Sequence, residues 1–236
     1  PLVRDLLAND IHSIRAIING TTNYILTRMA KEHVDYLTIL QDAQALGYAE
    51  SDPTNDVEGI DAAYKLAILS TLGFRCQVKH TDVFREGITR LGASDFIYAD
   101  ELGFNIKLLA IASRTGTRIQ ARVHPVLIEK KDMLAKVDGV LNAVEIETDL
   151  VGKVLFHGPG AGSLPTGSAV VADVVNISRS IVAGVSIPDP ITLTNSYEIS
   201  SMDELNAQYY IRLNAKDKPG VLAQISSVLG DNGISI

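Results

Sequence analysis

The sequence contains a single cysteine, Cys76, so no disulfide bond can form within the chain. We interpret Cys76 as a buried or half-buried thiol in a reducing compartment, which predicts a cytoplasmic protein. The five histidines are scattered, and no two of them have the spacing of metal ligands, so we expect no metal site. The apolar stretches are short and interrupted, which argues against a transmembrane helix. The first residues also lack the basic start and apolar run of a signal peptide.

Basic residues are too few for a nucleic-acid-binding protein. The chain has 21 Lys and Arg against 28 Asp and Glu, a net charge of −7, and no basic run offsets it. We therefore expect neither nucleic acid nor membrane as a partner. The 236 residues are 46% hydrophobic and 21% charged, which is typical of a soluble globular protein with one large domain or a domain and an appendage.

An acidic segment that ends in one lysine is the most informative feature present. Residues 47–65 read Gly-Tyr-Ala-Glu-Ser-Asp-Pro-Thr-Asn-Asp-Val-Glu-Gly-Ile-Asp-Ala-Ala-Tyr-Lys. The Asp-Pro pair favours a helix start, because proline at the first helical position gives up an amide hydrogen that would have no partner there. Asp61 and Lys65 are four residues apart, so their side chains meet on one helix face. Such a cluster can orient an amino group and deliver a proton.

The spacing by itself favours a structural explanation. An Asp–Lys pair four residues apart on a helix is usually a solvated surface pair worth about 0.2–0.5 kcal/mol. Asp52 or Asn55 can cap a helix, and Glu58 can be a surface charge. A chemical role for the segment therefore needs further support.

That support comes from a resemblance to a known family. The segment resembles the catalytic signature of homoserine dehydrogenases, Gly-Tyr-x-Glu-x-Asp-Pro-x-x-Asp-x-x-Gly-x-Asp-x-x-x-Lys, at every fixed position. Two distant segments are also similar to the family: residues 17–26, Ile-Ile-Asn-Gly-Thr-Thr-Asn-Tyr-Ile-Leu, and residues 157–166, His-Gly-Pro-Gly-Ala-Gly-Ser-Leu-Pro-Thr. The resemblance extends from the beginning of the chain to about residue 195.

The resemblance implies a reversible, NADP- or NAD-dependent reduction of L-aspartate-4-semialdehyde to L-homoserine. In this family an N-terminal Rossmann domain holds most of the cofactor, and its glycine-rich fingerprint is absent from this sequence. We therefore expect the chain to be the middle part of a longer polypeptide. The family also implies a homodimer or homotetramer, with one sheet face as the dimer interface. The choice between NADP and NAD and a fusion to an aspartate kinase stay open.

The same resemblance implies roles for individual residues. Lys65 is our candidate proton donor to the alkoxide that hydride transfer creates, with Asp61 holding it. A lysine in the cofactor domain remains an alternative donor. The other expected binding residues are Glu50 and Asp56 for the substrate ammonium, Gly20 and Thr21 for its carboxylate, Tyr48 for the pocket wall, and Gly158, Gly160 and Gly162 for the nicotinamide end of the cofactor. Such a glycine loop is by itself more often structural, but glycine also lets the backbone approach a ligand.

Hydrophobic periodicity predicts an α+β fold, with a mixed or antiparallel sheet that carries helices on one face. Alternating apolar residues predict strands over 12–18, 118–128, 140–148 and 151–156, and helical patterns cover 21–32, 35–46 and 166–181. Thr21 is expected to cap the helix over 21–32. A further helical pattern runs through 91–109, in which Lys107 would extend its ammonium to solvent.

The end of the chain resembles the first half of an ACT domain, a small amino-acid-sensing module. A strand over 209–213, a turn, a helix over 221–229 and a strand from Gly233 predict a partial ferredoxin-like βαβ unit. With a boundary marked by Pro188-Asp189-Pro190, we expect a catalytic and dimerisation domain over 1–200 and an ACT domain over 201–236. Asp217, Gly220 and Val221 would then bind an amino-acid effector, for which threonine is our hypothesis.

Two other functions stay open on the sequence. One is a catalytically inactive protein that senses amino acids through the ACT module, although the complete set of acidic residues and Lys65 speaks against a decayed site. The other is an enzyme with the same C-terminal architecture, such as a dihydrodipicolinate reductase or a thiol-dependent aldehyde dehydrogenase. Cys76 has no histidine near it in sequence, which weakens the thiol-dependent alternative.

Overall fold

The computed structural model describes residues 2, 5–185, 192–193 and 197–235. The chain divides into two compact units, Pro1–Leu205 and Asn206–Ile236. The predicted boundary at Pro188-Asp189-Pro190 lies outside the described residues.

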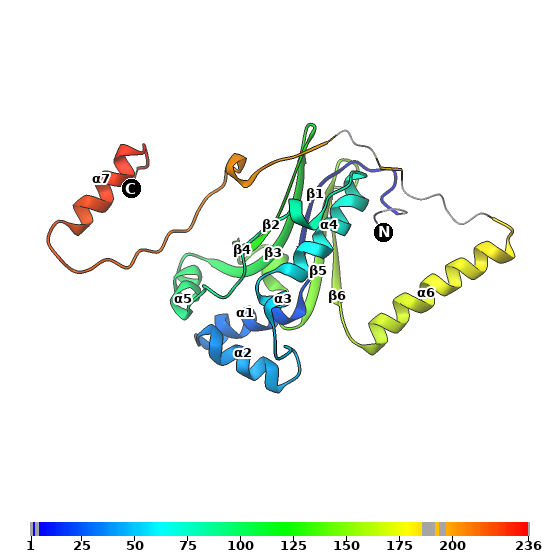
Figure 1. Cartoon of the computed structure of the whole chain (residues 1–236), viewed down its shortest axis with the longest axis horizontal. Helices are drawn as coiled ribbons and strands as arrows, with labels where there is room; N and C mark the ends of the chain where they lie inside the picture. The colour runs from blue at the N-terminus through cyan, green and yellow to red at the C-terminus, as the bar shows by residue number, and fades with distance from the viewer. Residues whose placement is uncertain (1, 3–4, 186–191, 194–196, 236) are drawn as a thin grey trace. The chain divides into compact units, whose positions relative to one another are not determined.

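A mixed sheet is the frame of the first unit (Figure 1), and seven strands belong to it among the described residues. Five long strands pair antiparallel in the order β4-β3-β1-β5-β6. They are β1 (Ile11–Ile17), β3 (Phe104–Thr115), β4 (Arg118–Glu129), β5 (Leu141–Thr148) and β6 (Lys153–Pro159). Two short strands, β2 (Phe84–Arg85) and β7 (Glu198–Ile199), pair in parallel with β4.

Helices cover one face of this sheet. They are α1 (Gly20–Glu32), α2 (Tyr36–Ala45), α3 (Thr54–Val57), α4 (Ile60–Phe74) and α5 (Ala93–Glu101). The main core joins Ile25, Leu66 and Phe96 of these helices to strand residues such as Ile14 and Ala110. The predicted α+β class, with helices on one sheet face, is therefore confirmed.

The other sheet face carries a smaller apolar cluster. Ile17, Leu109 and Ile128 of the sheet pack there with Leu134 and Val137. These last two residues belong to the connection between β4 and β5, which contains the short 3-10 helix η2 (Leu134–Lys136). The connection between β4 and β5 therefore packs on the sheet face opposite the helices before the chain enters β5.

The predicted helix over 91–109 is wrong beyond Glu101. Residues from Phe104 onward form β3, which lies between β1 and β4. A central strand is buried on both faces, so its apolar run is nearly continuous and cannot be told from a helix by period alone. Lys107 is only 2% exposed, so the expectation that its ammonium reaches solvent is also wrong.

The predicted cap of α1 needs a correction as well. Asn19, not Thr21, is the N-cap: its Oδ1 accepts a hydrogen bond from the Thr22 N–H at 2.9 Å. Asparagine is among the best N-cap residues because its side chain satisfies a backbone N–H that has no partner in the first turn. The cap therefore lies two residues earlier than predicted, and the helix begins at Gly20.

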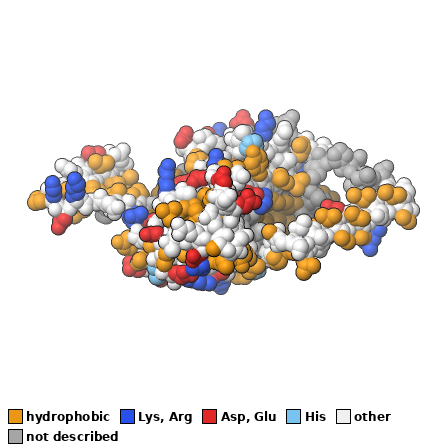
Figure 2. Space-filling model, turned by 60° about the horizontal axis from the view of Figure 1, so that its bottom comes forward, with side chains coloured by type: hydrophobic (Ala, Val, Ile, Leu, Met, Phe, Trp, Pro, Cys, Tyr) orange, Lys and Arg blue, Asp and Glu red, His pale blue; other side chains and the backbone are white. Residues whose placement is uncertain are grey.

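Helix α6 (Ser163–Val182) differs from the helices on the sheet, because none of its residues is buried. Val170, Val174, Ile177 and Ile181 each expose about half of their surface or more. Figure 2 shows such apolar side chains along this helix. No helix among the described residues is both long and apolar enough to cross a membrane.

The second unit contains α7 (Val221–Asp231), which confirms the predicted helix. The strands predicted over 209–213 and from Gly233 are not formed in the described residues of this unit. A strand needs a neighbour that accepts its backbone hydrogen bonds, and the described residues of this unit provide none.

We predict that Gly59→Ala destabilises the first unit. Gly59 separates α3 from α4 at a φ of 71°, and an added Cβ would lie 3.1 Å from Val123 Cγ1. A left-handed conformation costs a non-glycine residue about 1–2 kcal/mol, so urea unfolding should show a loss of that size. The control is Gly167→Ala in α6, where nothing lies within 4 Å of the added Cβ. This control should leave stability unchanged or raise it, and equal losses in the two variants would contradict the prediction.

Candidate active site

The side chain of Asn19 joins two carboxylates of the acidic segment. Asn19 lies between β1 and α1 and is 6% exposed. Its Nδ2 donates to Asp56 Oδ1 at 2.7 Å and to Asp61 Oδ2 at 3.0 Å. One amide therefore caps α1 and connects this helix to both α3 and α4. Sequence reasoning missed this role because it placed the helix cap at Thr21, although asparagine before a helical pattern is an N-cap signal.

The Lys65 ammonium is held against the same cluster. Its Nζ donates to Asp61 Oδ2 at 2.7 Å and to the Ile18 carbonyl at 3.1 Å. The side chain is 47% exposed, so the ammonium is fixed by two acceptors and still open to solvent. Because an ammonium has three N–H groups, one of them remains available for a ligand.

Local backbone geometry explains how the acidic segment reaches this place. Gly59 adopts a left-handed conformation and turns the chain between α3 and α4. The Val57 carbonyl accepts a hydrogen bond from the Ile88 N–H at 2.8 Å, which fixes the end of α3. Asp61 then falls in the first turn of α4, where the helix dipole favours a negative charge.

The loop that follows α2 lies beside the start of α1. Thr21 Oγ1 donates to the Tyr48 carbonyl at 2.7 Å, and the Tyr48 ring packs against Tyr24 at a centroid distance of 4.8 Å. Tyr48 is 45% exposed, so one side of its ring faces solvent. Glu50 is exposed in the same loop, and its carbonyl accepts from Gln44 Nε2 at 2.9 Å.

The other two acidic residues of the segment have local partners. Asp52 Oδ1 accepts hydrogen bonds from the hydroxyl and the N–H of Thr54, which lower the pKa of the Asp52 carboxyl. Glu58 Oε1 accepts from Thr89 Oγ1 at 2.9 Å. These contacts fit the structural roles that their sequence positions suggested.

The glycine loop begins at the end of β6. Gly158 is half-buried, whereas Gly160 and Gly162 are exposed, and Gly162 precedes α6 at a φ of 111°. A Cβ on Gly160 would overlap the side-chain amide of Asn142 on β5. Asn142 was not singled out in the sequence, since only the fold brings it beside this loop.

The remaining predicted site residues lie in the second unit. Gly220 has a φ of 89° and precedes α7, and Val221 is the first residue of that helix. Asp217 lies three residues before Gly220 and is exposed. No group of three or more histidine, cysteine or acidic side chains that could hold a metal ion occurs among the described residues.

Comparisons with known proteins give the same family over most of the chain. A family model described as homoserine dehydrogenase matches residues 1–175, and an ACT-domain model matches residues 209–236. A homoserine dehydrogenase of Neisseria gonorrhoeae is 45% identical over 98% of this chain and 54% of its own length. One from Synechocystis is 46% identical over 100% of this chain and 57% of its own length. The chain thus spans about half the length of the curated relatives it matches.

Solved structures agree with the sequence comparisons. A homoserine dehydrogenase from Thiobacillus denitrificans superimposes with a TM-score of 0.92 at 45% identity, over 100% of this chain and 56% of that protein. A hyperthermophilic archaeal homoserine dehydrogenase in complex with NADPH gives a TM-score of 0.63 at 31% identity, over 74% of this chain and 50% of that protein.

We predict that the link from Asn19 to the two carboxylates stabilises the site. Asn19→Ser keeps an N-cap oxygen but cannot reach Asp56 and Asp61, and hydrogen bonds to charged groups contribute about 1.5–3 kcal/mol. Asn19→Ala removes the cap too and should cost about 1 kcal/mol more. Urea unfolding of both variants separates the two contributions. A serine variant as stable as the unsubstituted protein would show that the link contributes nothing.

Proposed function

The chain belongs to the homoserine dehydrogenase family, and we propose that it provides the catalytic part of an enzyme that interconverts L-aspartate-4-semialdehyde and L-homoserine. The observation that carries this proposal is the Lys65 ammonium, which Asp61 and the Ile18 carbonyl fix while one side stays open to solvent. The proposed activity is that of the full-length protein. The comparisons give no support to an inactive amino-acid sensor.

Proton transfer is the role we assign to Lys65. The nicotinamide cofactor, when bound, supplies the hydride to the aldehyde carbon or accepts it from the alcohol. In the reducing direction the carbonyl oxygen gains negative charge, and Lys65 Nζ donates a proton to it. The ammonium also stabilises that charge while it develops. Asp61 holds the ammonium in place, and the exposed side of Lys65 lets solvent return the proton.

The rest of the cluster is suited to an amino acid with a free ammonium and a free carboxylate. We propose that Asp56, which gives one oxygen to Asn19, and Glu50 bind the substrate ammonium. The first turn of a helix leaves backbone N–H groups without intrahelical partners and favours anions. Gly20 and Thr21 open α1, so the substrate carboxylate would bind there, with Tyr48 as a wall of the pocket.

The glycine loop fits the approach of a nicotinamide ring. Gly160 and Gly162 are exposed, although the Asn142 side chain lies beside Gly160, and a Cβ on Gly158 would meet nothing within 4 Å. We propose that Gly158, Gly160 and Gly162 contact the nicotinamide end, whereas the ribose contacts that distinguish NADP from NAD lie in a separate Rossmann domain. NADPH is the nucleotide bound by the archaeal relative.

We also propose an effector site, domain bounds and an oligomeric state for the full-length protein. The match to the ACT domain supports an amino-acid effector, for which we keep threonine, at Asp217, Gly220 and Val221. We place the catalytic and dimerisation domain at 1–200 and the ACT domain at 201–236. The working form is a cytoplasmic homodimer or homotetramer.

The test is an assay of homoserine oxidation by the full-length protein at alkaline pH, with NADP and with NAD. Lys65→Ala should lower kcat by a factor on the order of 10² or more, because a positioned acid or base contributes about that much. The matched control is Lys130→Ala, since Lys130 forms an ion pair with Asp100 at 2.6 Å and is 45% exposed. Its kcat should not change.

Two outcomes would contradict parts of this proposal. An unsubstituted protein without activity with either cofactor would contradict the dehydrogenase. A Lys65→Ala variant with normal kcat would keep the dehydrogenase and move the proton donor to the cofactor domain.

A further inference from the structure

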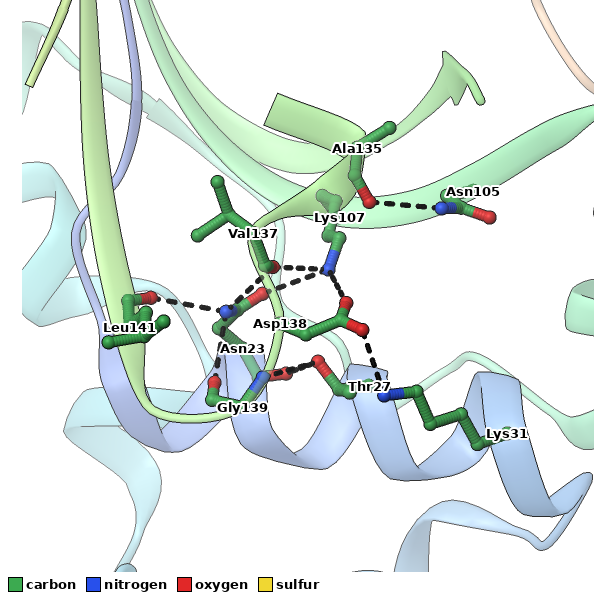
Figure 3. Close-up of polar contacts among 10 residues, drawn as sticks. All are labelled: Asn23, Thr27, Lys31, Asn105, Lys107, Ala135, Val137, Asp138, Gly139 and Leu141. Atoms are coloured by element: carbon green, nitrogen blue, oxygen red, sulfur yellow. Dashed lines mark hydrogen bonds and ion pairs between the residues drawn. The ribbon is translucent and has the colours of Figure 1, made fainter. Parts of the chain in front are cut away.

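Lys107 is a buried lysine that the proposed reaction does not use. It lies on β3 and is 2% exposed. Its Nζ donates to the Val137 carbonyl at 2.6 Å, to Asp138 Oδ1 at 3.1 Å and to Asn23 Oδ1 at 3.4 Å (Figure 3). Burial lowers the pKa of Lys107, and Asp138 opposes this effect. A buried ammonium is costly unless all of its N–H groups have partners, and here three acceptors surround it.

Asn23 of α1 binds the same segment as Lys107. Its Nδ2 lies within 3.1 Å of three carbonyl oxygens, those of Val137, Gly139 and Leu141. The Gly139 N–H in turn donates to Thr27 Oγ1 at 3.1 Å. We call residues 137–141, the segment that enters β5, the clamp turn. Its alternate carbonyls converge on one amide, so the clamp turn is fixed to α1 by its backbone (Figure 3).

The clamp turn contacts the start of α1 through Val140. Val140 belongs to the clamp turn, and its carbonyl oxygen would lie 2.9 Å from a Cβ on Gly20. Gly20 is the first residue of α1 and directly follows Asn19, which binds Asp56 and Asp61. A shift of the clamp turn therefore moves against the start of α1.

The residue that follows the clamp turn contacts the glycine loop. Asn142 is the next residue after the clamp turn, and its side-chain amide fills the space beside Gly160. Asn142 pairs with Gly158 across β5 and β6. Six consecutive residues, 137–142, thus contact both the start of α1 and the loop that we assign to the nicotinamide.

We propose that Lys107 is a positioning residue: together with Asn23 it fixes the clamp turn and so sets the spacing between the substrate-binding start of α1 and the glycine loop. The inference rests on the proposed dehydrogenase function. Hydride transfer needs reacting atoms held about 3–3.5 Å apart, and a displacement of 1 Å can lower the rate about 10²-fold. Lys107 touches no reactant and acts through its contacts with the clamp turn and with Asn23.

The experiment compares Lys107→Met with Asn105→Ala in the full-length protein. Methionine has a similar length but no charge and no donor. Asn105 lies two residues from Lys107 on β3, and its Nδ2 donates to the Ala135 carbonyl at 3.0 Å, outside the clamp turn (Figure 3). The readouts are kcat and the primary deuterium isotope effect on kcat, with homoserine deuterated at the carbon that bears the hydroxyl.

In Lys107→Met we expect kcat to fall by about 10- to 100-fold and the isotope effect to rise, because misaligned hydride transfer becomes the slowest step. Asn105→Ala should lower stability and leave the isotope effect unchanged. If Lys107→Met lowers kcat only because fewer molecules are folded and active, the isotope effect will stay unchanged. That result would overturn the proposal. If Lys107→Met does not fold, Thr27→Val removes the contact with Gly139 and should change the isotope effect in the same direction by less.

A second readout does not depend on activity. Hydrogen exchange of the backbone amides in 137–142 and 157–162 should be faster in Lys107→Met, or in Thr27→Val, and unchanged in Asn105→Ala. Unchanged exchange in 157–162 would overturn the coupling, even if the unsubstituted protein turned out not to be a homoserine dehydrogenase. Inactivity of the unsubstituted protein alone would contradict only the proposed function.

Discussion

The contacts of the Asn19 side chain are the interaction on which the rest of the site depends. Its oxygen caps α1, and its nitrogen binds one carboxylate from α3 and one from α4. Asp61 then holds Lys65, whose second acceptor is the carbonyl of Ile18, the residue before Asn19. A single buried amide therefore joins the end of β1 to three helices. Through these contacts it fixes the positions of Asp56 and Asp61, and Asp61 in turn fixes Lys65.

The sequence predicted the local contact between Asp61 and Lys65 better than the framework around it. Asp61 and Lys65 were paired correctly because a four-residue spacing fixes their geometry within one helix. Asn19 was missed because its partners are 37 and 42 residues away, and no local pattern indicates such contacts. The predicted helix over 91–109 was wrong beyond Glu101 for a related reason: only the neighbours β1 and β4 make residues 104–115 a strand.

Lys107 shows how far local patterns can mislead. A lysine in an apolar run normally extends its ammonium to water, but here the fold provides carbonyls and a carboxylate close to the strand. Those acceptors lie 84 residues before Lys107, in α1, and 30 and 31 residues after it, in the connection before β5. The result is a buried polar cluster around Lys107 that fixes residues 137–141, which lie between the start of α1 and the glycine loop. The sequence does not indicate this cluster, because its members are far apart along the chain and meet only in the folded sheet.

The central claim is that the Lys65 ammonium, held by Asp61, carries the proton in homoserine oxidation. Chemical rescue tests it most directly: the Lys65→Ala variant of the full-length protein is assayed with added primary alkylamines of different pKa. The account predicts that activity returns in proportion to amine concentration and varies with amine pKa, as expected for an external acid or base in the vacated position. An impaired variant that no amine restores, whatever its size or pKa, would contradict the claim.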